Sequence, residues 1–135
     1  MIYMLRRNME RRMIFDWPET THKLSTQLRD LRAGDGVTDV MKAFAAMAQN
    51  ATKTGALEPK TKELMAVAIS VATRCDDCIA FHARAAVNLG ASQEELMETL
   101  GLAIYMGAGP SVMYASHAVQ AFSQFAAAKK TTAVE

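Results

Sequence analysis

The stretch Leu64-Met65-Ala66-Val67-Ala68-Ile69-Ser70-Val71-Ala72 is the longest apolar run of this 135-residue chain. Its residue types favour a helix, and it lacks the apolar–polar alternation of a half-buried strand. Pro59 precedes the run at a position typical of the first turn of a helix. Because apolar residues occur on nearly all sides, we expect this helix to be central and buried. The run is about half as long as a membrane-spanning helix, so no membrane partner is expected.

Turn and cap residues divide the rest of the chain into further helices. Gly34-Asp35-Gly36, Gly90 and Gly107-Ala108-Gly109-Pro110 are helix terminators, whereas Ser92-Gln93-Glu94-Glu95 is a capping box that begins a helix. We therefore expect helices at about 18–32, 39–51, 76–88, 93–106 and 111–128, with a frayed tail from Lys129. A further helix should begin at Pro59 and carry Glu63 and the apolar run. The predicted fold class is all-α: a single-domain bundle of about six helices over residues 13–135.

The second of these predicted helices is amphipathic. Its apolar residues Val40, Phe44, Met47 and Ala48 fall on one face.

Composition and charge narrow the class of function. Half of the residues are apolar and the net charge is +1, so nothing indicates a nucleic-acid partner. Four arginines among residues 1–12, opposed by Glu10 alone, form a basic N-terminal extension that we expect to be poorly ordered. The apolar residues at the very start precede the arginines, which is the reverse of a secretory signal. The chain is therefore expected to be cytoplasmic.

The candidate site begins with the two cysteines, which stand in Cys75-Asp76-Asp77-Cys78-Ile79-Ala80-Phe81-His82. In the cytoplasm a C-x-x-C pair is more often catalytic or metal-binding than a structural disulfide. At the start of a helix, unpaired backbone N–H groups and the helix dipole favour thiolate over thiol. Asp76 and Asp77 oppose this effect, because their charges lie close to the sulfurs. A nearby proton acceptor would therefore be needed to activate the thiols.

His82 and Glu63 are the candidates for moving that proton. His82 follows Cys78 by one helical turn and so lies on the same face of the helix. Glu63 interrupts the start of the most apolar helix. It is either the solvated end of that helix or a carboxylate that points inward and orients the imidazole of His82.

The spacing Glu63-x11-Cys75-x2-Cys78-x3-His82 resembles the signature of alkylhydroperoxidase D-like proteins of the carboxymuconolactone decarboxylase superfamily. The resemblance extends through Gly90-Ala91-Ser92 and the break at 107–110, and covers roughly residues 37–125. It implies an all-helical domain that forms homotrimers or homohexamers. It also implies a peroxidase or disulfide reductase that uses the C-x-x-C pair. We expect no cofactor and no bound metal.

The same resemblance implies a role for each site residue. Cys78 would attack a small hydroperoxide or disulfide substrate, and Cys75 would resolve the product as a disulfide that an external dithiol reduces. His82 would act as the base and Glu63 would complete a proton relay. The best-known alkylhydroperoxidase D has a histidine immediately before the second cysteine, where this chain has Asp77, so one proton carrier of that enzyme is missing.

Three alternatives stay open. Cys75, Cys78 and His82 could hold zinc with Glu63 or His117 as fourth ligand. The chain could be a carboxymuconolactone decarboxylase-type lyase that uses His82 on a small lactone, although such enzymes generally lack the cysteine pair. It could also be a non-catalytic oligomerisation module. For His117 itself, a place on the helix surface or in a subunit contact is favoured over a place in the site.

Overall fold

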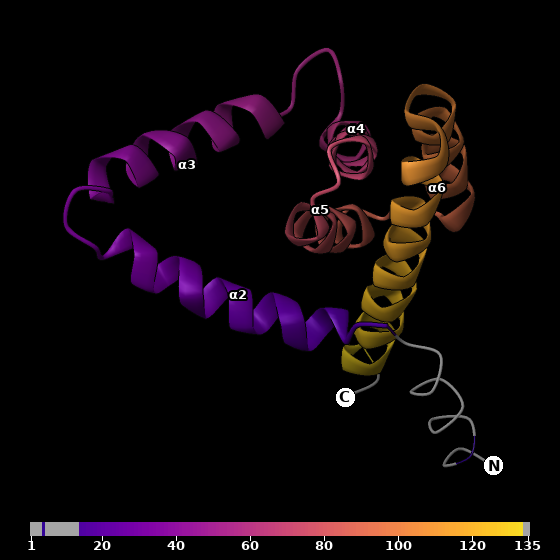
Figure 1. Cartoon of the computed structure of the whole chain (residues 1–135), viewed down its shortest axis with the longest axis horizontal. Helices are drawn as coiled ribbons and strands as arrows, with labels where there is room; N and C mark the ends of the chain where they lie inside the picture. The colour runs from indigo at the N-terminus through magenta and orange to yellow at the C-terminus, as the bar shows by residue number, and fades with distance from the viewer. Residues whose placement is uncertain (1–3, 5–13, 134–135) are drawn as a thin grey trace.

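The computed structural model describes Met4 and residues 14–133, and in these residues it contains helices and no strands. The helices are α2 (Trp17–Arg32), α3 (Thr38–Thr52), α4 (Pro59–Ala72), α5 (Asp76–Asn88) and α6 (Gln93–Thr132) (Figure 1). The predicted all-α class is confirmed. Except for Met4, the predicted basic extension at 1–12 lies outside the described residues.

Helix α6 combines the last two predicted helices into one element with a kink. Ala108 has φ 54° and ψ −143°, which lies outside the helical region, and Pro110 follows it. Just before the kink, a Cβ on Gly107 would lie 1.9 Å from the Ser111 hydroxyl oxygen, so this position has room only for glycine. The predicted break at 107–110 is thus a sharp bend, and the helix continues beyond it.

The core lies between α4, α5 and the two halves of α6. Val67 and Val71 of α4 and Ile79 of α5 are fully buried there. The predicted capping box fixes the start of α6, because Ser92 Oγ accepts the Glu95 backbone N–H at 3.1 Å and Glu95 Oε2 accepts that of Ser92 at 2.8 Å.

Helix α4 was expected to be central and buried; it contacts α3, α5 and α6, but in the single chain only one of its sides is buried. Val67, Ser70 and Val71 face the core, whereas Met65 and Ile69 are 48% and 60% exposed. Helices α5 and α6 cover only one face of α4. Its outer face is apolar and uncovered.

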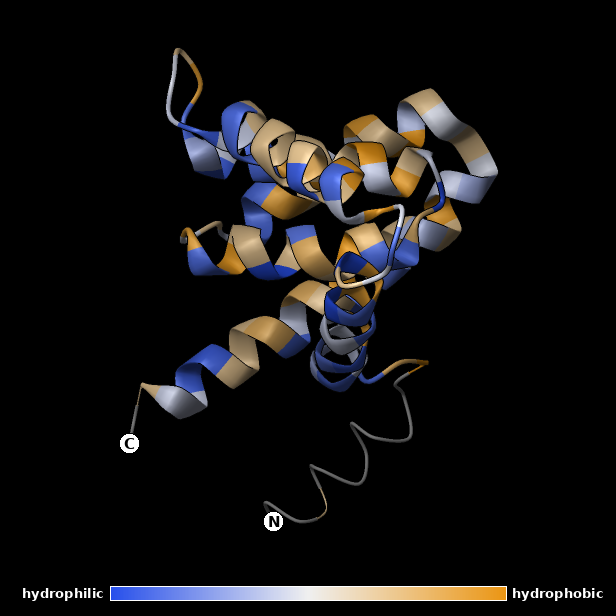
Figure 2. Cartoon of the chain, turned by 90° about the vertical axis from the view of Figure 1, so that its left-hand side faces the viewer, coloured by the Kyte–Doolittle hydropathy of each residue, from blue (hydrophilic) through white to orange (hydrophobic). Residues whose placement is uncertain are grey.

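Helix α3 lies apart from the core (Figure 1). It contacts its chain neighbours α2 and α4 but neither α5 nor α6, and none of its residues is buried. Val40, Phe44 and Met47 of its predicted apolar face are more than half exposed. Apolar and polar residues are interleaved along the helices (Figure 2), as expected for amphipathic elements.

The two ends of the described chain are fixed by specific contacts. Trp17 is 1% exposed, and its backbone N–H donates to Gln124 Oε1 at 2.8 Å. Lys129 was expected in a frayed tail, but α6 continues to Thr132. The Lys129 ammonium donates to the Val87 and Asn88 carbonyls at 3.2 and 3.5 Å and so closes the C-terminus of α5. No helix in the described part is long and apolar enough to cross a membrane.

Candidate functional site

The two cysteines lie where the chain turns from α4 into α5. Arg74 has φ 59°, and this left-handed residue lets the next backbone N–H, that of Cys75, return to the Ser70 carbonyl at 3.0 Å. Cys75 is the N-cap of α5, and its sulfur accepts the Cys78 backbone N–H at 3.2 Å. The two residues form a disulfide and both are half-buried. The C-x-x-C pair is therefore at a helix N-terminus, as the sequence predicted.

Glu63 and His82 form a hydrogen-bonded pair between α4 and α5. Glu63 Oε2 lies 2.6 Å from His82 Nδ1. Glu63 is 8% exposed, whereas the His82 side chain is 36% exposed. Of the two interpretations of Glu63, the structure supports the inward-pointing one.

This contact has a chemical consequence for the imidazole. An ionised carboxylate can only accept hydrogen bonds, so Nδ1 carries the proton that it shares with Glu63. Nε2 is then the nitrogen of His82 with a free lone pair, and it can accept a proton from a reacting group. Because Cys78 is one turn earlier on α5, the spacing suits proton transfer directly or through a water.

A second histidine–carboxylate pair lies at the start of α5 and was not predicted. Asp76 Oδ1 is 2.7 Å from Nδ1 of His117, which comes from the second half of α6. The His117 side chain is 19% exposed and lies among aromatic rings, with centroid distances of 5.6 Å to Phe15, 6.2 Å to Trp17 and 5.2 Å to Tyr114. His117 is therefore half-buried against the start of α5 and not on an open helix surface, whereas its predicted role in a subunit contact stays a prediction. No local sequence signal joins residues 41 positions apart.

The zinc alternative has little support from this arrangement. Among the described residues, no three histidine, cysteine, aspartate or glutamate side chains are grouped so that they could hold a metal ion. His117, one of the suggested fourth ligands, bonds to Asp76. His82 bonds to Glu63.

Comparison with known proteins identifies the family. The sequence profile of the Carboxymuconolactone decarboxylase family matches residues 38–121, a segment that contains the two cysteines, Glu63 and both paired histidines. The chain belongs to this family, and its cysteine pair is consistent with the alkylhydroperoxidase D-like members.

Two solved structures of family proteins share the fold. A protein from Legionella pneumophila has 48% sequence identity and a TM-score of 0.77, over 82% of this chain and 96% of its own. A protein from Thermotoga maritima, described as a candidate for a role in an antioxidative response, has 28% identity and a TM-score of 0.74, over 84% and 95%. An uncharacterized protein of Cupriavidus necator is 39% identical over 107 residues, which are 76% of this chain and 95% of that protein.

Proposed function

We propose that this protein is a thiol-dependent reductase of small hydroperoxides, or of disulfides, that uses Cys75 and Cys78 as its redox pair. The observation that carries the proposal is the disulfide at the N-terminus of α5 together with the Glu63–His82 pair. Family membership and the antioxidative description of the Thermotoga maritima protein support it.

In the proposed reaction, His82 Nε2 takes the proton of the Cys78 thiol. The thiolate attacks one peroxide oxygen, the O–O bond breaks, and the alkoxide leaves as an alcohol after receiving that proton. Cys78 is then a sulfenic acid. The Cys75 sulfur attacks the Cys78 sulfur, water leaves, and the disulfide forms. An external dithiol reduces it and becomes a disulfide itself.

The test starts from fully reduced protein. Peroxide should remove two hydrogens per chain, which appears as a mass decrease that dithiothreitol reverses. Cys78→Ser should abolish peroxide consumption, whereas Cys75→Ser should leave a sulfenic acid on Cys78 that a dimedone reagent traps. The reverse pattern would exchange the roles of the two cysteines. If peroxide leaves both thiols free, the proposal is wrong.

A lyase acting on a small lactone is the second candidate, because the matching profile carries the name of a decarboxylase family. In that case His82 would be the acid–base group and the thiols would take no part. A variant with both cysteines changed to serine separates the two functions. Lactone turnover that survives in this variant favours the lyase.

We further propose that the active form is a homo-oligomer, a trimer or hexamer. The support is the apolar surface that a single chain leaves uncovered on α3 and α4, which includes Phe44 at 58% and Ile69 at 60% exposed. Phe44→Lys should lower the molar mass measured by light scattering. Gln49→Lys adds the same charge to α3 at an exposed polar position and should leave the mass unchanged. A monomeric wild type would contradict this proposal.

A further inference from the structure

The pair formed by Asp76 and His117 places a half-buried histidine against one of the two carboxylates that lie between the cysteines. Asp76 is the first residue of α5 and directly follows the N-cap Cys75. Its side chain is 34% exposed and that of His117 is 19% exposed. The aromatic rings around His117 restrict the position of the imidazole, so the 2.7 Å contact is held from the α6 side.

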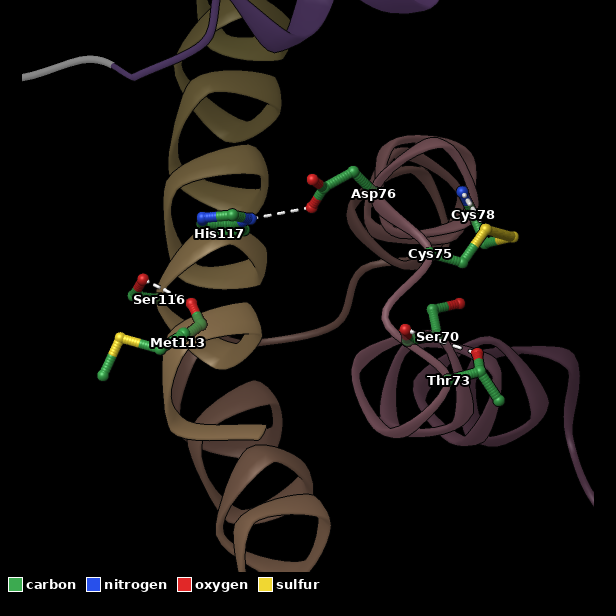
Figure 3. Close-up of polar contacts among 8 residues, drawn as sticks. All are labelled: Ser70, Thr73, Cys75, Asp76, Cys78, Met113, Ser116 and His117. Atoms are coloured by element: carbon green, nitrogen blue, oxygen red, sulfur yellow. Dashed lines mark hydrogen bonds and ion pairs between the residues drawn. A yellow bond between two sulfur atoms is a disulfide. The ribbon is translucent and has the colours of Figure 1, made fainter. Parts of the chain in front are cut away.

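The carboxylate and the sulfurs point in different directions from the start of α5. In Figure 3 the Asp76 side chain extends toward His117 on α6, whereas the Cys75–Cys78 disulfide lies on the opposite side of the same turn. Asp77, the other carboxylate of this first turn, is exposed and has no bonded partner in the described structure.

A carboxylate in the first turn has two opposing effects. It stabilises the helix through the dipole, but it disfavours a thiolate that forms beside it. Both effects depend on where the charge is held. A histidine N–H that binds the carboxylate offsets part of its charge and keeps it away from the sulfurs.

We propose that His117 is a positioning residue that holds the Asp76 carboxylate toward α6 and thereby favours the thiolate form of the reduced C-x-x-C pair. This inference rests on the proposed thiol chemistry, since it concerns the reactivity of the same two cysteines. His117 lies on α6, so this residue would affect the cysteines of α5 through Asp76, without contacting a sulfur or the substrate.

Alkylation by iodoacetamide at pH 7 tests the inference without any peroxide. The thiolate sulfur displaces iodide and forms a thioether, so the rate constant reports the fraction of thiolate. His117→Phe keeps a ring among the aromatic neighbours but cannot donate a hydrogen bond. It should lower the alkylation rate of the reduced protein by about two- to fivefold, the size expected for one charge near a helix terminus. Asp76→Asn should raise the rate.

Double variants separate positioning from a general loosening of the fold. In the Asp76→Asn background, His117→Phe should have no further effect. In the matched Asp77→Asn background, it should keep its full effect. His117→Asn, which retains a donor, should stay closer to wild type than His117→Phe.

The inference is overturned if His117→Phe leaves the rate unchanged, if it changes the rate in the same direction as Asp76→Asn, or if its effect persists in the Asp76→Asn background. Should His117→Phe fail to fold, Asp76→Asn alone decides, and a rate that does not rise overturns the inference. A protein that shows the expected alkylation pattern but does not consume peroxide would contradict the proposed function and leave this inference standing.

Discussion

Replacing Glu63 by glutamine tests the relay most directly, because the change keeps the shape of the side chain and removes its charge. In the wild type, the buried carboxylate binds His82 Nδ1 at 2.6 Å and holds the proton on that nitrogen. A hydrogen bond to a charged group contributes about 1.5–3 kcal/mol. Since about 1.4 kcal/mol corresponds to a factor of ten in rate, Glu63→Gln should slow peroxide-driven disulfide formation by about 10- to 150-fold.

The assay follows disulfide formation after reduced protein is mixed with hydrogen peroxide, by quenching with an alkylating reagent and measuring mass. Glu98→Gln, the same change at an exposed position of α6, is the matched control and should react like wild type. If Glu63 acts through the imidazole, Glu63→Gln should have little further effect in a His82→Asn background. Independent, additive losses, or a wild-type rate in Glu63→Gln, would refute the relay.

Three further predictions concern the scaffold. Gly107→Ala should destabilise the fold by about 1–3 kcal/mol, because the added Cβ would lie 1.9 Å from the Ser111 hydroxyl oxygen. Gly101→Ala should stabilise the fold by about 0.5–1 kcal/mol, because no atom lies within 4 Å of the added Cβ. Urea unfolding of both variants measures the two changes. Lys129→Met should lower the free energy of unfolding by about 0.5–1.5 kcal/mol through loss of its bonds to the end of α5, and Lys130→Met should not. The hydrogen bond from Lys60, followed by that from the Ser92 backbone, lowers the pKa of Glu95 below its usual 4.5. The stability that Glu95 contributes is therefore present above pH 4.5 and lost as the pH falls through its lowered pKa, so melting curves of Glu95→Gln and wild type should differ at pH 7 and converge in acid; a constant difference would contradict this.

The helix boundaries could be predicted because their signals are local. Pro59 begins α4, and the reciprocal bonds of Ser92 and Glu95 begin α6. Each depends on residues within one turn of the chain. The Glu63–His82 contact was also within reach, because α4 and α5 are joined by a short turn that brings neighbouring helices together.

Features that depend on distant packing could not be predicted in the same way. His117 meets Asp76 only because the second half of α6 passes the start of α5, beyond the kink at Ala108. Lys129 reaches the end of α5 for the same reason. An apolar pattern in the sequence also does not show which surface packs against the apolar face that it predicts. The sequence predicts an apolar face around Met65 but not whether this chain or another one buries it.

The first turn of α5 has two conflicting requirements: carboxylates that stabilise the helix, and a thiolate that those carboxylates disfavour. His82 and His117 lie on different sides of this turn. Asp76 and Asp77 favour the helix but oppose a negative sulfur at its N-terminus. Asp77 is exposed, so water and salt screen its charge. Asp76 is partly buried and less screened, and it is the one that a histidine binds. On the proposed thiol chemistry, His82 then moves the proton while His117 reduces the electrostatic cost of the charge left behind. The missing histidine at position 77 would thus be compensated in part from α6 and not from the motif itself.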